Sequence, residues 1–213
     1  LFQQKFVNQI KNVIFPSLSK LQDNNEELIN SYVNIVRFIS MAAFPALIGL
    51  FVLAYPTVDI LWGDKWHPIA DPLKILCIPA MISCLVKPVQ SVFLCKHRPD
   101  LPFKLSIARL VVTFIAVITL GYLFELIGVA YGMLLSSLVG FLNIYFALKL
   151  TRQKITGLIK ALIPSIMASA IMGISVYIIY TTLNKYHSEY ISFVSSMTTG
   201  IIVYVLIYIC FFN

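Results

Sequence analysis

One lysine lies inside a long apolar run, where a charged side chain is unusual. Lys87 precedes Cys95, the end of that run, by eight residues. A helix would therefore place it about 12 Å from the end, at 1.5 Å per residue. In a membrane such a charge costs a few kcal/mol and commonly faces a water-filled cavity or a partner. Two interpretations stay open: a cation that attracts an anionic substrate, and a lysine whose ammonium group snorkels to the headgroups.

Pro88 and a few polar residues could shape a path around this cation. Pro88 removes a backbone donor and bends a helix, and it is expected to push Lys87 away from helical geometry. Gln90, Ser91 and Asn143 also lie in apolar runs. Each could line a substrate path, although interhelical hydrogen bonding is the more common role of such residues. The candidate path is therefore Lys87, Pro88, Gln90 and Asn143.

The pattern of reactive side chains does not predict an enzyme or a metal site. The histidines stand in three separate connections, and the sequence contains no HExxH, GxSxG or GxxxxGK[ST] motif. Asp59, Asp64 and Asp71 share one connection, the expected outer loop Pro56–Pro72, and could pair or bind a cation, but a solvated interfacial loop explains them as well. The four cysteines lack ligand spacing and are interpreted as apolar fillers. We expect no catalytic residue, no metal and no cofactor.

The composition predicts what must position these residues. The chain of 213 residues is 59% hydrophobic and only 12% charged, whereas soluble domains are roughly 25% charged. Runs of about 18–25 apolar residues are long enough to cross a bilayer as helices. The sequence therefore predicts an all-α integral membrane protein with six transmembrane helices. The runs are Phe38–Tyr55, Leu73–Cys95, Leu105–Phe124, Leu126–Leu148, Leu158–Thr182 and Ile191–Phe212.

The net charge of +7 predicts an orientation and not a nucleic-acid partner. Alternate connections carry twelve basic residues on one side and three on the other. The twelve are Lys5, Lys11, Lys20, Arg37, Lys96, Arg98, Lys104, Arg109, Lys149, Arg152, Lys154 and Lys160, and the three are Lys65, Lys74 and Lys185. By the positive-inside rule, the side with twelve and the C-terminus are cytoplasmic.

Small residues four apart predict two helix-packing ridges. In lipid, such ridges allow helices to approach closely. The first ridge is Gly128, Gly132, Ser136 and Gly140, and the second is Ser165, Ser169 and Gly173.

We expect four segments along the chain. Residues 1–37 form a cytoplasmic amphipathic segment: the end of a preceding helix with an apolar face from Phe2 to Ile14, then a surface helix capped by Asp23 or Asn24. The apolar stripe of this second helix is Leu28, Tyr32, Ile35 and Ile39, and it runs into the first span. Residues 38–148 hold four transmembrane helices, residues 149–160 a basic cytoplasmic loop, and residues 161–213 two further transmembrane helices. The link between the third and fourth spans is so short that they must form an antiparallel hairpin.

Four stretches resemble the C-terminal half of bacterial polysaccharide exporters of the MOP (multidrug/oligosaccharidyl-lipid/polysaccharide) superfamily. They are FPSLSKLQ (15–22), FPALIGLFVLA (44–54), GDKWHPIADPLKIL (63–76) and KHRPDLPFKLSIAR (96–109), the last with His97 where glycine is usual. The resemblance implies a fourteen-helix transporter with two lobes around a central cavity, of which this chain holds the last six spans. The missing N-terminal half would then be a partner. The lipopolysaccharide, teichuronic and colanic acid exporter branch fits better than drug exporters.

The resemblance implies translocation of a lipid-linked saccharide across the bacterial inner membrane by alternating access. Lys87 would offset the charge of a pyrophosphate. A multidrug or cation exporter of the same superfamily is the main alternative, although such exporters typically need intramembrane acids. A membrane polysaccharide polymerase or ligase would need a larger outer loop with catalytic residues. A purely structural membrane subunit is a further alternative.

Overall fold

The computed structural model describes residues 24–186 and 188–212, all of its regular elements being helices. The predicted apolar face from Phe2 to Ile14 lies outside these residues, as does Asp23. Five stretches of the described chain are long and apolar enough to cross a membrane. One of them, Asp100–Thr151, has 52 residues and reverses direction within its length, so each of its two arms is a candidate span. The prediction of an all-α membrane fold with six long apolar helical spans is confirmed.

Helix α2 (Asn25–Val52) is continuous from its polar start into the first span. The Asn24 side chain accepts hydrogen bonds from the backbone nitrogens of Glu26 and Glu27, at 3.1 and 3.3 Å. Asn24 is thus the predicted N-cap, and both acids lie in the first turn where the helix dipole favours them. No break separates the expected surface helix from the span.

The segment expected to be an outer loop, Pro56–Pro72, is mostly helical. Helix α3 (Ala54–Trp62) follows α2 directly, and the 3₁₀ helix η1 (Asp64–Ile69) leads into α4 (Ala70–Val86). The ring of a proline clashes with the carbonyl four residues before it, so Pro56 ends α2 at Val52 and is tolerated in the first turn of α3. Gly63, at φ 83°, makes the sharp turn between α3 and η1.

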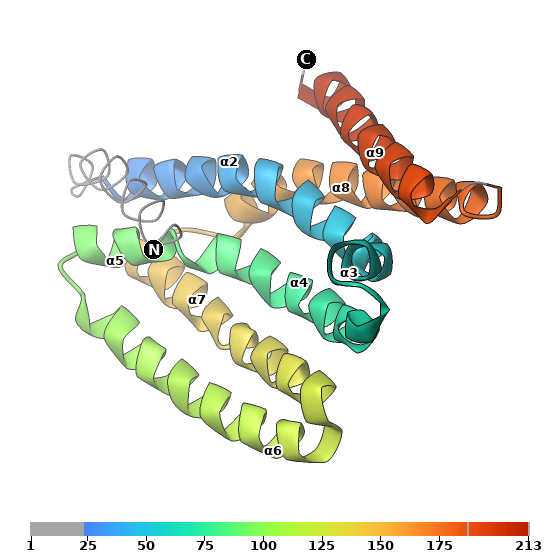
Figure 1. The fold of residues 1–213 in the computed structure, drawn as a ribbon. Coiled ribbons are helices and arrows are strands. Elements are labelled where there is room, and N and C mark those ends of the chain that lie inside the picture. Colours follow the sequence, from blue (N-terminus) through green and yellow to red (C-terminus); the bar gives the residue numbers. More distant parts are fainter. Residues whose placement is uncertain (1–23, 187, 213) are drawn as a thin grey trace.

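Helix α5 (Val89–Cys95) continues α4 after an interruption at Lys87 and Pro88. Helix α6 (Asp100–Leu138) consists of two arms, because Phe124 and Glu125 have non-helical backbone angles and reverse the chain. Helix α7 (Gly140–Thr151) extends the second arm. Figure 1 shows the two arms running back alongside each other, so the predicted hairpin is confirmed.

Helices α8 (Thr156–Leu183) and α9 (Glu189–Phe212) complete the described chain. Helix α8 packs along α2, whereas α9 starts at the end of α8 and runs at an angle away from it (Figure 1). The Tyr204 hydroxyl of α9 donates a 2.7 Å hydrogen bond to the carbonyl of Met41. Pro45 lies four residues after Met41 and cannot donate to that carbonyl, so Tyr204 satisfies a group that proline leaves unpaired.

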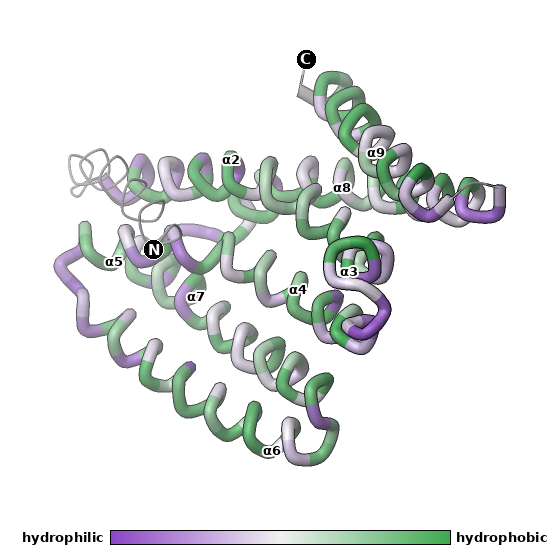
Figure 2. The backbone as a smooth tube through the Cα atoms, viewed as in Figure 1, coloured by the Kyte–Doolittle hydropathy of each residue, from purple (hydrophilic) through white to green (hydrophobic). Residues whose placement is uncertain are grey.

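The larger hydrophobic core gathers α2, α5, α7 and the start of α8 at one end of the bundle. Tyr32, Val36, Val89, Phe93 and Ile144 are among its buried residues. A smaller cluster around Leu53, Met172 and Val176 joins α2, α8 and α9 toward the other end. Hydrophobic residues dominate the helices, and hydrophilic residues concentrate at their ends and connections (Figure 2).

Candidate functional site

Lys87 lies at the interruption between α4 and α5, with an exposed side chain. Its backbone is helical, at φ −57° and ψ −44°, so the expectation that Pro88 displaces Lys87 from helical geometry was wrong. Because Pro88 has no backbone N–H, the carbonyl of Cys84 loses its helical hydrogen bond. The next turn is wound more tightly, with hydrogen bonds three instead of four residues back. Gln90 and Ser91 donate to the carbonyls three residues before them, Lys87 and Pro88, at 3.3 and 3.2 Å. Proline thus bends the helix without moving the lysine off it.

A buried tyrosine holds this interruption against α2. Tyr32 is 1% exposed, and its hydroxyl donates a 3.0 Å hydrogen bond to the carbonyl of Leu85, two residues before Lys87. Val89 and Phe93, directly after the interruption, are fully buried in the same core. The bend is therefore fixed by a specific contact between helices. Sequence reasoning placed Tyr32 on an apolar stripe and gave no sign of this bond.

The structure groups some of the candidate path residues but not all. Lys87 and Gln90 lie three residues apart and are both exposed, with Pro88 between them partly buried. Asn143 is partly buried on α7, beside the core residue Ile144. Within the described chain, no hydrogen bond or ion pair links Asn143 to the other three.

An exposed polar row on α2 is a candidate that the sequence analysis missed. Glu27, Asn30, Asn34 and Arg37 recur every three or four residues and are all exposed. The row runs about 15 Å along the helix, opposite the buried face that contains Tyr32. Charged and amide groups on a long apolar helix need water or a partner, since lipid offers no hydrogen bonds. The three- and four-residue spacing was the available signal, and the apolar stripe between these residues obscured it.

The first small-residue ridge lies against two neighbours. A Cβ on Gly128 would lie 1.8 Å from the Leu120 carbonyl oxygen, and one on Gly132 would lie 2.9 Å from the Val117 backbone. Gly140 instead faces α4, where a Cβ on Gly140 would lie 3.0 Å from Cγ2 of Val86. Ser136 is buried between them, and its hydroxyl donates to the Met133 carbonyl at 2.9 Å.

The second ridge faces α2. The Ser165 and Ser40 hydroxyls lie 3.5 Å apart. A Cβ on Gly173 would lie 2.7 Å from Cγ2 of Ile48. Ser169 is fully buried, and its hydroxyl has no hydrogen-bond partner in the described structure. These residues allow α2 and α8 to pack closely over several turns.

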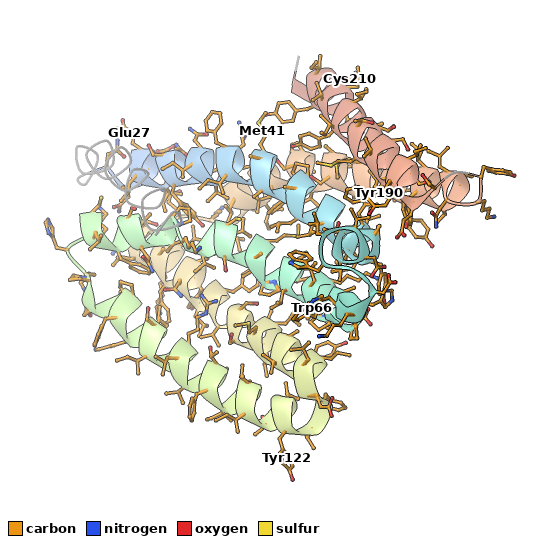
Figure 3. All side chains as sticks on the ribbon, viewed as in Figure 1. Glu27, Met41, Trp66, Tyr122, Tyr190 and Cys210 are labelled. Atoms are coloured by element: carbon orange, nitrogen blue, oxygen red, sulfur yellow. The ribbon has the colours of Figure 1, made fainter. Side chains whose placement is uncertain are left out.

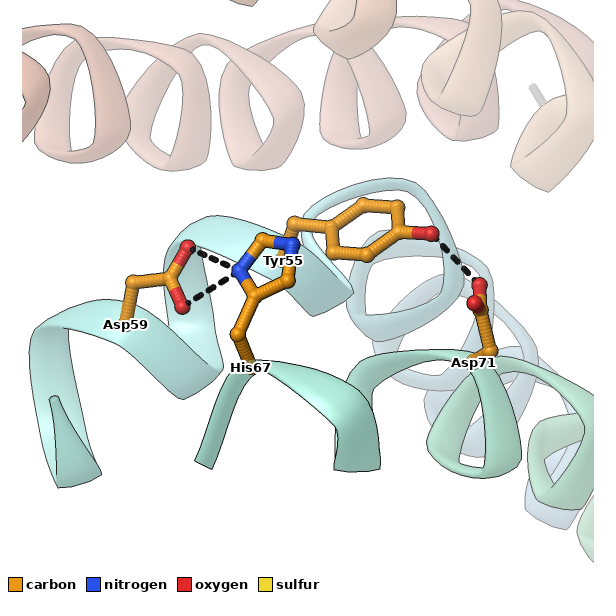
Figure 4. A network of polar contacts seen from close by, with 4 residues as sticks. All are labelled: Tyr55, Asp59, His67 and Asp71. Carbon is orange, nitrogen blue, oxygen red and sulfur yellow. Dashed lines mark hydrogen bonds and ion pairs between the residues drawn. The ribbon is translucent and has the colours of Figure 1, made fainter. Parts of the chain in front are cut away.

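A polar network joins α3, η1 and α4 at the opposite end of the bundle from Glu27 (Figures 3 and 4). His67 contacts both carboxylate oxygens of Asp59, at 2.9 and 3.0 Å, and stacks on the Tyr55 ring. The Tyr55 hydroxyl donates to Asp71 at 2.5 Å, and this bond raises the pKa of the phenol. The Lys74 ammonium lies 3.7 Å from the centre of the Tyr55 ring.

This network separates the acids that sequence analysis considered as a pair or a cation site. Asp59 is engaged by His67, and Asp71 by Tyr55. Among the described residues, no group of three or more His, Cys, Asp or Glu side chains could hold a metal ion. The arrangement closes the turn between α3 and α4, beside Trp62 and Trp66, which are both exposed.

Comparisons with known proteins relate this chain to polysaccharide biosynthesis proteins and to one flippase structure. The family described as "Polysaccharide biosynthesis protein" matches residues 1–71. Lipopolysaccharide biosynthesis protein WzxC of Escherichia coli is 30% identical over 139 residues, covering 65% of this chain and 28% of the relative. Teichuronic acid biosynthesis protein TuaB of Bacillus subtilis is 30% identical over 94 residues, covering 44% and 20%. The chain thus spans less than a third of the length of either relative.

A solved structure of lipid II flippase MurJ, in an inward closed conformation, shares the fold with a TM-score of 0.76. The match covers 95% of this chain and 42% of MurJ, at 18% sequence identity. The fold therefore defines the class: a multi-pass, α-helical membrane protein built like a MurJ-type transporter. Together with the family and the two relatives, it confirms the more particular resemblance to polysaccharide exporters of the MOP superfamily.

Proposed function

We propose that this chain forms one lobe of a transporter that moves a lipid-linked saccharide precursor across the bacterial inner membrane by alternating access. The observation that carries the proposal is the exposed polar row on α2, together with exposed Lys87 and Gln90 on α4–α5. Both helices continue as long apolar stretches. A second lobe, supplied outside these 213 residues, would cover these polar faces, the α2 row lying at the cytoplasmic mouth of a central cavity. The names of the two relatives support a role with polysaccharides, and the name of MurJ, a lipid II flippase, supports the movement of a lipid-linked molecule.

In this proposal Lys87 attracts the substrate phosphate, while the bend at Pro88 aims its side chain. The interruption is rigid on the α2 side, because Tyr32 and the buried Val89 and Phe93 fix it. Gln90 would add a neutral donor one turn away on the same exposed face. Asn143 lies outside this group and is assigned to interhelical contact.

The proposed orientation places the α2 start, the connection after α5 and the connection between α7 and α8 in the cytoplasm. The C-terminus then lies in the cytoplasm as well. The distribution of lysine and arginine supports this orientation. The division into 1–37, 38–148, 149–160 and 161–213 stays part of the proposal.

The test is a Lys87→Ala variant of the protein expressed from its full open reading frame. We expect surface polysaccharide to fall about tenfold, since a charge-assisted hydrogen bond contributes about 1.5–3 kcal/mol. The matched control is Lys185→Ala, an exposed lysine after α8. Membrane abundance of both variants is measured by immunoblot. Export at the wild-type level with Lys87→Ala would remove Lys87 from the mechanism.

A further inference from the structure

An apolar groove lies beside the connection between α7 and α8. It has a volume of about 550 Å³. Phe141 and Tyr145 of α7 face Ile159 and Leu162 of α8 across it. The one charged side chain in its lining is Lys149, and the one amide is Gln153. An apolar groove with a cation and an amide at the loop end suits a molecule with a hydrocarbon chain and an anionic head.

The surroundings of the groove are basic. Lys149, Arg152, Lys154 and Lys160 occur within twelve residues that contain no Asp or Glu, and all four side chains are exposed. In the described part of the chain, no ion pair involves any of them. Basic pockets between membrane helices bind the headgroups of anionic lipids, and each lysine or arginine near the surface contributes about 1 kcal/mol.

The groove and the candidate path lie on different sides of α4. Leu85 lines the groove, whereas Lys87 comes two residues later. Both residues have helical backbone positions, and a rotation of about 200° over two residues leaves their side chains about 160° apart. A molecule in the groove therefore does not lie on the face that carries Lys87 and Gln90.

We propose that this groove binds an anionic phospholipid of the surrounding membrane. One acyl chain lies along Phe141, Tyr145, Ile159 and Leu162, and the phosphate accepts hydrogen bonds from Lys149 and Gln153. The separation from Lys87 favours a resident membrane lipid over the lipid chain of the transported molecule. The bound lipid fills the space between α7 and α8 and fixes their connection.

The experiment places a photoreactive benzophenone amino acid at position 145 of the full protein, in vesicles of phosphatidylethanolamine and phosphatidylglycerol. Mass spectrometry identifies the lipids attached after illumination. We expect phosphatidylglycerol to exceed its share of the bulk lipid about fivefold. The matched control position is Tyr177, a tyrosine of similar exposure on the distal half of α8 (57% against 60%), where no enrichment is expected.

Two charge variants and one competitor decide the result. Lys149→Gln should return phosphatidylglycerol to near its bulk share, whereas Lys160→Gln, outside the lining, should leave the enrichment in place. Equal loss in both variants would show general surface attraction and overturn the proposal, as would a bulk lipid ratio at position 145. Displacement of phosphatidylglycerol by an added polyisoprenyl phosphate would assign the groove to the transported lipid and also overturn it.

Discussion

Replacing Gly128 with alanine tests how tightly the two arms of α6 are joined. The added Cβ would lie 1.8 Å from the Leu120 carbonyl oxygen, whereas ordinary contact begins at 3.4 Å. The arms would have to separate by 3.4 − 1.8 = 1.6 Å. For Gly132→Ala the nearest backbone atoms lie at 2.9 Å, so the required shift is 3.4 − 2.9 = 0.5 Å. The obstacle is backbone in both cases and cannot rotate away.

Overpacking costs about 1–3 kcal/mol, and more when backbone must move. We therefore expect Gly128→Ala to lower the free energy of unfolding by about 3 kcal/mol or more, and Gly132→Ala by about 1 kcal/mol. The matched control is Gly157→Ala, in the first turn of α8, where no atom lies within 4 Å of the added Cβ. Alanine there should stabilise by about 0.5 kcal/mol, because glycine is the poorer helix former.

The assay is thermal unfolding of the purified protein in one detergent, followed by circular dichroism. At roughly 2–4 °C per kcal/mol for a chain of this size, Gly128→Ala should lower Tm by about 10 °C. Gly132→Ala should lower it by about 3 °C, and Gly157→Ala should leave it unchanged or slightly raised. If the Gly128→Ala protein had the same Tm as the Gly157→Ala protein, the close contact at the hairpin and the reasoning from it would be refuted.

Three further predictions concern two tyrosine hydrogen bonds, the backbone angle of His97 and the proposed orientation. Tyr32→Phe and Tyr204→Phe each leave a backbone carbonyl without its tyrosine donor, so each should cost about 1 kcal/mol in thermal unfolding; no change in either would contradict the assigned bonds. His97 has φ 52°, so His97→Gly should match or exceed the wild-type Tm, whereas His97→Val should lose about 1–2 kcal/mol. In intact cells, an impermeant thiol reagent should label Tyr186→Cys but not Lys154→Cys, measured against a cysteine-free parent; the reverse pattern would invert the proposed orientation.

The sequence predicted the parts of the fold that depend on local patterns. Long apolar runs predicted the spans, and Asp23 or Asn24 followed by two acids predicted the start of α2. The segment Pro56–Pro72 was expected to be an outer loop between two apolar runs. Its helices instead depend on Pro56 fitting a first turn and on contacts among Tyr55, His67 and Asp71.

The candidate site was less predictable, because it depends on contacts between distant residues. Lys87 was found as a charge in an apolar run, but its helical backbone was not. The bond from Tyr32 to Leu85 joins residues 53 apart, and no local pattern reveals it. The polar row on α2 was readable in principle, since its spacing is helical, yet spacing alone does not say which face the core leaves exposed.

The two-residue reversal at Phe124 and Glu125 has a consequence for biogenesis. The two ends of this hairpin opposite the turn lie near basic residues, Lys104 and Lys149. The proposed orientation keeps both of these ends in the cytoplasm. Only the turn itself must pass through the bilayer, and Glu125 is the one charge within it. With no polar loop to carry across, the two crossings can enter the lipid together as a preformed pair. Their backbone contact, between Gly128 and Leu120, lies within the pair and needs no other helix to form.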